Sequence, residues 1–455
     1  MSVAPRRRRR HLVPATLLVA AVMAAPAPAL ALAGWSPADT IAGGNVSGPQ
    51  VSAAAGGTVL YAGEDGSIQG AARTALAFAP PMTLFRPPAS EHVAAFDLAQ
   101  DGGAVILTLR RTAPHQRVRA RFRRPDGTLS VPQTISGPGH PARQPSLAVA
   151  PNGSAIAAWA WHDRPGWRVQ AATRPAGGVF GRAQTLSAAN RSRPFIEVAV
   201  GPRGDAAVAY QFGGSFMEPE KRLAVTTAAA GRLFTPARAR RDSGSHADTA
   251  LAVSATGEVL VAYEPTYYLD RAEREPGLLI VARGQAGQPL GASLQLDRVR
   301  HSDAQLGAVG AAFTGAGDAI VAWVRDDGTQ VFGEARVAAY VRSAGSADFA
   351  PGRPLSTQHR APGGVVVAGG GDHRAVVAWF DDDPRAGHVA QVVRAATRPA
   401  QGGAFSAPAA LSPAGVIGLW PGVAITASGD TLATWTRSIE GFGSGGVQAA
   451  VRPAR

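Results

Sequence analysis

The chain has 455 residues, no cysteine and a formal net charge of +13, and 45% of its residues are hydrophobic but only 6% aromatic. The lack of cysteine excludes disulfide bonds and a lipid-modified N-terminal cysteine. The positive charge comes almost entirely from arginines that are spread along the whole sequence, which argues against nucleic acid as a partner.

Residues 1–33 have the pattern of an export signal. Arg6–Arg10 form a basic run, an apolar stretch covers residues 12–25, and Ala31–Ala33 fits a cleavage site of the Ala-x-Ala type. The last two arginines also match a twin-arginine signal, but a run of five matches that pattern by chance, so we favour the general secretory route. Removal of these five arginines with the signal would lower the net charge from +13 to about +8. We predict a secreted monomer with no stable membrane insertion after signal removal.

From about residue 48 the sequence repeats itself every 46 to 60 residues. Each repeat has a strand such as "PSLAVAP", a turn such as Asn152-Gly153, and an apolar run, which is typical of a β-hairpin. A third strand such as "VQAATRP" (169–175) and a fourth such as "FGRAQTLS" (180–187) follow. Seven of the eight apolar runs end in an aromatic residue, namely Tyr61, Trp159, Tyr210, Tyr263, Trp323, Trp379 and Trp435.

Four antiparallel strands per repeat predict an all-β fold, a closed β-propeller in which each repeat is one blade. A helical solenoid is disfavoured because no segment sustains a period of 3.6 residues. We predict one domain over residues 34–455 with eight four-stranded blades. Seven blades are the alternative, because the second repeat lacks the aromatic residue and the first is short. The blades are expected to start near residues 48, 92, 145, 194, 248, 305, 363 and 420.

The two ends of the chain predict how the ring closes. The last repeat stops at Arg455 just after its third strand, while the segment 35–42, which begins at Trp35, has the pattern of the missing fourth strand. Pairing this N-terminal strand with the last blade would cover an exposed sheet edge. We therefore expect the strand 35–42 to complete the last blade.

An arginine closes the third strand of most repeats. Residues that recur once per blade pack blade against blade, so we assign a structural role both to these arginines and to the repeated Trp and Tyr residues. The arginines are Arg73, Arg174, Arg283, Arg342, Arg398 and Arg452.

The repeat covers nearly the whole mature chain. It reads Gly-x-Ala-φ-φ-Ala-Trp, where φ is an apolar residue, and is followed by AATRP, Phe and Leu-Ser. It resembles the repeats of secreted propeller proteins of high-GC Gram-positive bacteria, which are distantly similar to sialidase-like propellers. The sialidase Asp box, Ser-x-Asp-x-Gly-x-x-Trp, is missing from the sequence, and Phe85-Arg86-Pro87-Pro88 only approximates the Phe/Tyr-Arg-Ile-Pro motif. The resemblance implies the propeller fold and transfers no catalytic residue.

The loops that join consecutive blades and the loops between strands two and three open on the same face of a propeller. Their varied lengths and unusual residues make that face the candidate binding surface. Arginines there would bind carboxylate, sulfate or phosphate, and exposed aromatic rings would stack on sugars. The candidate residues are His140, Arg143, Arg191, Arg193, Arg241, His246, Arg298, Arg300, His301, His359, Arg360, Trp161, Trp167, Tyr267, Tyr268 and Trp420.

Three functions remain open from the sequence. The favoured hypothesis is a non-catalytic binding module for an anionic polysaccharide, a cell-wall polymer or a cell-surface protein. The enzyme alternative is a sialidase-like glycoside hydrolase or polysaccharide lyase that uses Tyr267 or Tyr268 with Glu264. The third possibility is a structural ring that presents a protein interface. No motif indicates a cofactor, and no His-x-His or His-x₃-His pair indicates a metal site, so we expect neither.

Overall fold

The structure is a computed structural model. It describes residues 34–44, 46–53, 56–110, 116–212, 223–240, 246–266, 277–299, 309–326, 334–357, 359–360, 362–382, 391–413, 415–439 and 443–454. These residues form strands and no helix, so no described helix is long and apolar enough to cross a membrane. The predicted export signal lies outside the described residues.

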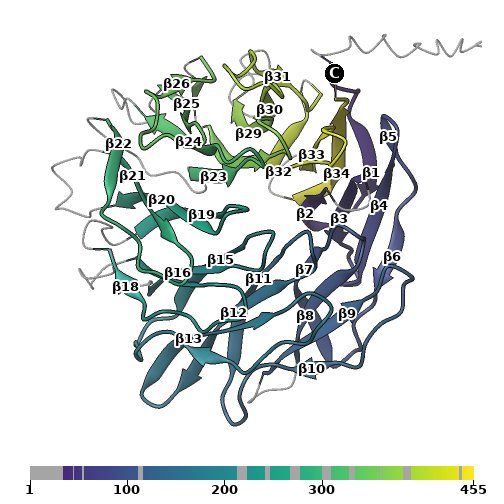
Figure 1. Ribbon diagram of the computed structural model, residues 1–455. Helices are drawn as coiled ribbons and strands as arrows, with labels where there is room; N and C mark the ends of the chain where they lie inside the picture. Colours follow the sequence, from purple (N-terminus) through teal and green to yellow (C-terminus); the bar gives the residue numbers. More distant parts are fainter. Residues whose placement is uncertain are drawn as a thin grey trace, which may run out of the picture. The chain divides into compact units, whose positions relative to one another are not determined.

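Eight blades form a β-propeller (Figure 1). Each blade begins with an innermost strand beside the ring axis. In blades 1 to 8 these strands are β2 (Ser47–Ser52), β7 (Glu91–Leu98), β11 (Ala142–Val149), β15 (Pro194–Val200), β19 (His246–Val253), β23 (Val309–Phe313), β28 (Gly363–Gly369) and β32 (Ile417–Ile425). The eight-blade prediction is confirmed.

The other strands of each blade follow outward in antiparallel order. The second strands are β3 (Thr58–Ala62), β8 (Ala104–Arg110), β12 (Ala155–Asp163), β16 (Ala206–Phe212), β20 (Glu258–Thr266), β24 (Ala319–Asp326), β29 (Ala375–Asp382) and β33 (Thr431–Ile439). The third strands are β4 (Ile68–Thr74), β9 (Val118–Arg123), β13 (Gly166–Arg174), β17 (Ala224–Ala228), β21 (Leu278–Gln285), β25 (Glu334–Arg342), β30 (Gln391–Arg398) and β34 (Gly443–Arg452).

The outermost strands are short in most blades. They are β6 (Met82–Phe85), β10 (Gln133–Thr134), β14 (Gln184–Thr185), β18 (Arg238–Ala239), β22 (Leu294–Arg298), β26 (Arg353–Pro354), β31 (Ala409–Ala410) and β1 (Asp39–Gly43). Blades 1 and 6 each carry one further short strand, β5 (Ala77–Phe78) and β27 (His359–Arg360).

The N-terminal strand completes blade 8, as predicted. Strand β1 pairs antiparallel with β34, so that Asp39 lies opposite Ala449. Just before β1, the backbone N–H of Ser36 donates to the carbonyl of Val451 (2.7 Å), and the N–H of Val451 donates to the Ser36 hydroxyl (3.0 Å). Trp35 is only 3% exposed and packs in the apolar core shared by blades 7 and 8. The two ends of the chain therefore hold the ring closed.

The second strand of each blade is covered on both faces by neighbouring sheets, which is why it is a continuous apolar run and does not alternate. The repeated aromatic residue of this strand is buried in the seven blades that carry one. The indole N–H groups of the four buried repeat tryptophans donate to buried acceptors: Trp159 to Gln170, Trp323 to Glu264, Trp379 to Asp381 and Trp435 to Gln448. Their role is structural, as predicted.

Several of the arginines that close strand three connect neighbouring blades. The guanidinium of Arg398 in blade 7 lies 2.6 Å from the carboxylate of Asp318 in blade 6, and Arg73 in blade 1 lies 2.7 Å from Asp430 in blade 8. Arg342 in blade 6 makes the same kind of pair with Glu258 in blade 5 (2.7 Å). In each case the acid lies in or beside the turn between the first two strands of the preceding blade. These pairs join blades at sites removed from the ring axis.

Candidate functional site

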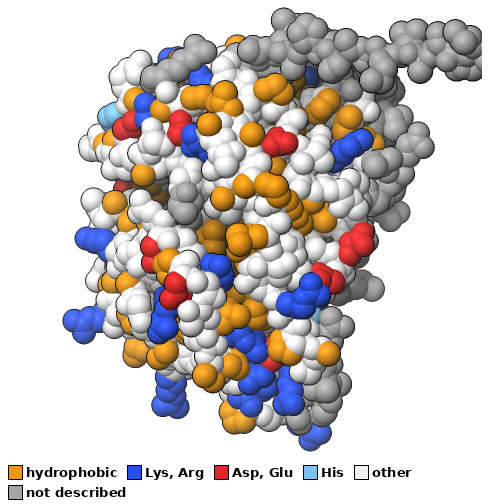
Figure 2. All heavy atoms as spheres, turned by 90° about the vertical axis from the view of Figure 1, so that its right-hand side faces the viewer, with side chains coloured by type: hydrophobic (Ala, Val, Ile, Leu, Met, Phe, Trp, Pro, Cys, Tyr) orange, Lys and Arg blue, Asp and Glu red, His pale blue; other side chains and the backbone are white. Residues whose placement is uncertain are grey.

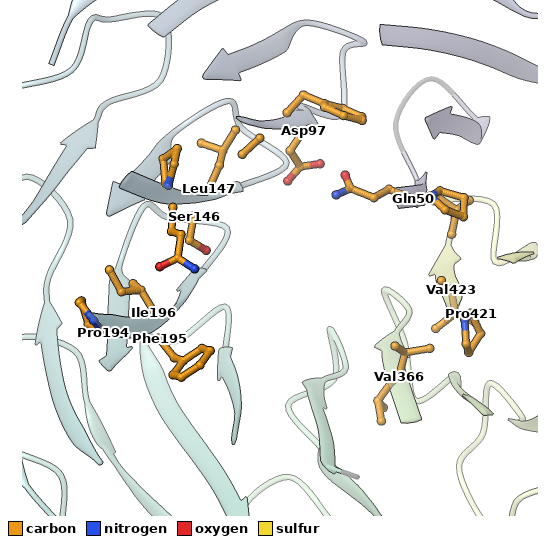
Figure 3. Close-up of a pocket in the computed structure, with 18 residues that line it drawn as sticks. Gln50, Asp97, Ser146, Leu147, Pro194, Phe195, Ile196, Val366, Pro421 and Val423 are labelled. Carbon is orange, nitrogen blue, oxygen red and sulfur yellow. The ribbon is translucent and has the colours of Figure 1, made fainter. Parts of the chain in front are cut away.

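An axial cavity of about 720 Å³ lies inside the ring. The innermost strands of blades 1, 2, 3, 4, 7 and 8 line it. Figure 3 shows Gln50 and Asp97 directed into the opening on one side of the ring, and Pro421 and Val423 on another. The described lining residues contain carboxylate, amide and hydroxyl groups but no arginine or histidine. The described arginines and histidines of the predicted cationic loops therefore do not line this cavity.

Two carboxylic acids of the innermost strands hold protons more tightly than usual. Burial raises the pKa of Asp97 to about 6, although the backbone N–H groups of Leu98 and Val149 donate to its carboxylate and oppose that shift. The pKa of Glu197 on β15 is raised to about 8, first by loss of hydration inside the ring and then by the nearby Asp248 carboxylate. The Glu197 side chain is nevertheless exposed to solvent. At neutral pH these pKa values leave Asp97 mostly ionised and Glu197 mostly protonated.

Aromatic, histidine and arginine side chains of blade 3 and of the loops that lead into and out of it form two groups, one on each face of the blade. We call His140, Trp161, His162, Trp167 and Arg193 the blade 3 cluster. The rings of His140 and Trp161 meet edge to face with centroids 4.9 Å apart, as do those of His162 and Trp167 at 4.8 Å. The Arg193 guanidinium lies over the Trp167 ring, 5.4 Å from its centroid.

The hairpin that carries this cluster is fixed to the loop beside it. The N–H of Trp167 donates to the carbonyl of Asn190 (2.7 Å), and the N–H of Asn190 donates back to the carbonyl of Trp167 (2.8 Å). Gly166 makes this approach possible, because a Cβ atom there would lie 2.4 Å from the Asn190 carbonyl oxygen. The backbone of this loop therefore holds the rings and Arg193 together.

Three arginines beside the blade 3 cluster carry charge that no neighbouring acid balances. Arg191 and Arg193 are exposed and Arg143 is half-buried, and none of the three forms an ion pair with a described residue. Arg143 and Arg193 immediately precede Gln144 and Pro194, which line the axial cavity. Arg73, Arg342 and Arg398 at the ends of third strands differ, because the pairs described above neutralise them.

The other predicted site residues lie elsewhere. Trp420, in blade 8, is 53% exposed, and its ring meets Phe380 edge to face at 6.1 Å. Arg298 is exposed at the end of β22 in blade 5. Residues Arg241, Tyr267, Tyr268, Arg300 and His301 lie outside the described part of the chain, and the side chains of His246, His359 and Arg360 are not described although their backbones form β19 and β27.

The acids and amides of the innermost strands were not among the predicted site residues. A usable signal was present, because Asp97 in "AAFDLA" and Glu197 in "PFIEVAV" are carboxylic acids inside otherwise apolar strands. Glu264, the acid of the enzyme alternative, is 2% exposed and accepts a hydrogen bond from the Trp323 indole (3.1 Å). Among the described residues, no three His, Asp or Glu side chains gather in a way that could hold a metal ion.

On the side of the propeller that carries β5 and β6, basic, acidic and hydrophobic side chains are interspersed (Figure 2). The high content of arginine does not produce a continuous basic surface there. The basic surface patch that we propose is therefore limited to the residues beside the blade 3 cluster.

No protein-family model matches the chain, and no curated protein matches its sequence. Among solved structures, the chain is similar to the polysaccharide lyase Uly1, at 9% identity and a TM-score of 0.46 over 80% of this chain and 90% of the lyase. It is also similar to prolyl oligopeptidase B from Galerina marginata (10%, 0.46, 89% of this chain and 56% of that one) and to the NanB sialidase from Streptococcus pneumoniae (8%, 0.40, 90% and 94%). At such low identity these likenesses concern the fold alone.

Proposed function

We propose that this protein is an exported, non-catalytic module that binds an acidic polysaccharide across the blade 3 face of the ring. The observation that carries the proposal is the set of unpaired cations, Arg143, Arg191 and Arg193, beside the ordered rings of Trp161 and Trp167. Such a surface combines the two contacts that an acidic sugar polymer offers.

The guanidinium groups supply the charge recognition. An exposed arginine binds a carboxylate or sulfate through two parallel N–H bonds, and a partner acid within the protein would compete for those donors. Arg193 stacks on Trp167, which fixes the plane of its guanidinium and lowers the entropy lost when it meets a ligand. The Asp97 carboxylate inside the ring, which is mostly ionised at neutral pH, disfavours deep entry of the acid groups and keeps them on the loop face.

The aromatic residues supply contact area. Trp161 and Trp167 are half-buried, and each is held in place by a histidine. Their exposed portions offer apolar area on which the C–H face of a sugar ring can lie. Glu264 accepts a hydrogen bond from the buried Trp323 indole, so we propose no catalytic role for it.

The test is the affinity of the purified protein for polygalacturonate and chondroitin sulfate, measured by microscale thermophoresis at low and high salt. We compare a triple variant, Arg143→Ala, Arg191→Ala and Arg193→Ala, with a control triple, Arg124→Ala, Arg182→Ala and Arg353→Ala. The control removes the same charge from exposed arginines on the opposite face, in or beside the connections between strands three and four.

Hydrogen bonds to charged groups contribute about 1.5–3 kcal/mol each, so losing even two should weaken binding on the order of 100-fold or more. The control triple should stay within roughly threefold of the unaltered protein, and salt should weaken binding to the unaltered protein. Equal weakening by both triples would show that net charge alone is responsible. Full affinity in the first triple would overturn the proposal.

A further inference from the structure

Four innermost strands contain the same bulge. In blades 1, 3, 7 and 8, two consecutive residues of the innermost strand lie opposite the single buried aromatic residue of the second strand. The bulged pairs are residues 48–49, 144–145, 364–365 and 420–421, and the aromatic residues opposite them are Tyr61, Trp159, Trp379 and Trp435. The four positions are therefore structurally equivalent.

The first residue of each bulge has a left-handed backbone. Its φ is +57° at Gly48 and +60° at Gly364, but also +45° at Gln144 and +52° at Trp420. Only glycine adopts such angles without steric cost, and the proline after Gln144 and after Trp420 restricts those residues further. Two blades thus carry the residue that the backbone favours, and two carry large side chains that it disfavours.

Both disfavoured residues lie in innermost strands that line the axial cavity. Gln144 is exposed and lines the cavity, and Pro421, directly after Trp420, lines it as well. Trp420 is 53% exposed and leans on Phe380. A Cβ atom at Gly364 would lie 2.6 Å from the Phe380 ring, so glycine in blade 7 gives Phe380 the space to support Trp420.

The place of Trp420 in the ring complements the blade 3 cluster. Eight blades follow one another in chain order, so blades 7 and 8 lie half a turn from blades 3 and 4. Figure 3 shows Pro194 and Phe195 of blade 4 on one side of the opening and Val366 and Pro421 of blades 7 and 8 on the other. A polymer that contacts the blade 3 cluster and crosses the opening would arrive at Trp420.

We propose that Trp420 forms a second subsite, which takes an uncharged pyranose ring. A strained backbone at a non-glycine residue persists where the side chain has a function. Here glycine fits the same backbone in two other blades, so the strain is not required by the fold. The exposed indole offers a flat apolar platform for the C–H face of a sugar. Across the opening, the Gln144 amide can both donate to and accept from hydroxyl groups of another sugar of the same polymer. The Asp97 carboxylate among the residues that line the cavity favours a neutral ring over an anionic one. This inference deepens the proposed function, on which its account of a spanning polymer rests.

The experiment measures binding of neutral cello-, xylo- and manno-hexaoses at high salt, where the arginine contribution is screened. We compare Trp420→Ala, Trp420→Phe and Gln144→Gly with the control Leu233→Ala, which removes an exposed apolar side chain from a turn between strands three and four. Trp420→Ala should weaken binding about tenfold or more, while Trp420→Phe should retain most of the affinity. Leu233→Ala should change nothing.

A further variant separates strain from ligand contact. Trp420→Gly loses the ring but relieves the backbone, so it should melt at a higher temperature than Trp420→Ala while binding equally poorly. If no neutral hexaose binds and the Trp420 variants leave polygalacturonate binding unchanged, the second subsite is refuted, and the arginine triple still decides the proposed function. If the Trp420 variants lose binding and the arginine triple does not, the subsite stands and the acidic-polymer proposal falls.

Discussion

Replacing Trp35 by alanine should open the ring at its closure. The side chain is 3% exposed and belongs to the core shared by blades 7 and 8, with Trp435 and Ala450 among its members. A buried tryptophan removes about 150–250 Å² from water. At ~25 cal/mol per Å² this is about 4–6 kcal/mol, an upper bound from which the alanine still recovers a part. Large-to-small changes of this kind cost about 3–5 kcal/mol, which is the loss we expect.

The assay is urea unfolding followed by near-ultraviolet circular dichroism, together with hydrogen exchange at the Val451 amide. That amide donates to the Ser36 hydroxyl, so its exchange should accelerate when the N-terminal segment detaches. Trp420→Ala is the matched control, because it removes the same side chain from a half-exposed position and should cost about 1 kcal/mol or less. A Trp35→Ala protein as stable as this control, with slow exchange at Val451, would show that the segment does not hold the ring closed.

Two further predictions concern acids whose pKa values are shifted. Burial alone would raise the pKa of Glu91, but hydrogen bonds from Arg121, Thr108 and Arg119 lower it to about 2 from its usual 4.5. The stability it contributes is therefore present above pH 4.5 and lost as pH falls towards 2. Arg121→Leu removes one of the two arginines that pair with Glu91, so it should cost about 1.5–3 kcal/mol in urea unfolding at neutral pH, while Arg119 still pairs with the carboxylate. For Glu197 the sign is opposite: the folded pKa of about 8 exceeds the usual 4.5, so stability falls as pH rises between these values. Glu197→Gln should flatten that part of a plot of melting temperature against pH, and an unchanged slope would contradict the assignment.

The fold could be predicted because every blade of the propeller has the same local sequence pattern. Second strands such as β12 are buried on both faces and read as apolar runs, while the turn at Asn152-Gly153 marks the hairpin before them. The terminal strand was recognisable because Trp35 begins a segment with the pattern of a fourth strand. The outer strands of two residues, such as β10 and β14, are too short for any periodicity, and only their fixed place after strand three locates them.

The candidate site was only partly predictable, because it is assembled across blades. His140 and Trp161 meet although a whole strand separates them in the chain, and the left-handed backbone at Gln144 contradicts the preference of its own residue type. The carboxylic acids of the innermost strands gain their shifted pKa values from neighbouring blades, which no window of local sequence contains. Loop composition located the exposed arginines but gave no indication of which ones lack an acid partner.

The pairing of β1 with β34 also has a consequence for the order in which the blades fold. It joins Asp39 to Ala449, a separation of 410 residues along the chain. Closing a flexible loop of that length costs about 3 kcal/mol more in chain entropy than closing a hairpin of ten residues. Blades 1 to 7 are built from nearby residues and can form first, and each one formed shortens the flexible path between the two ends. Blade 8 is therefore the last to be completed, and until then the final strands present an unpaired edge to any other unfolded chain.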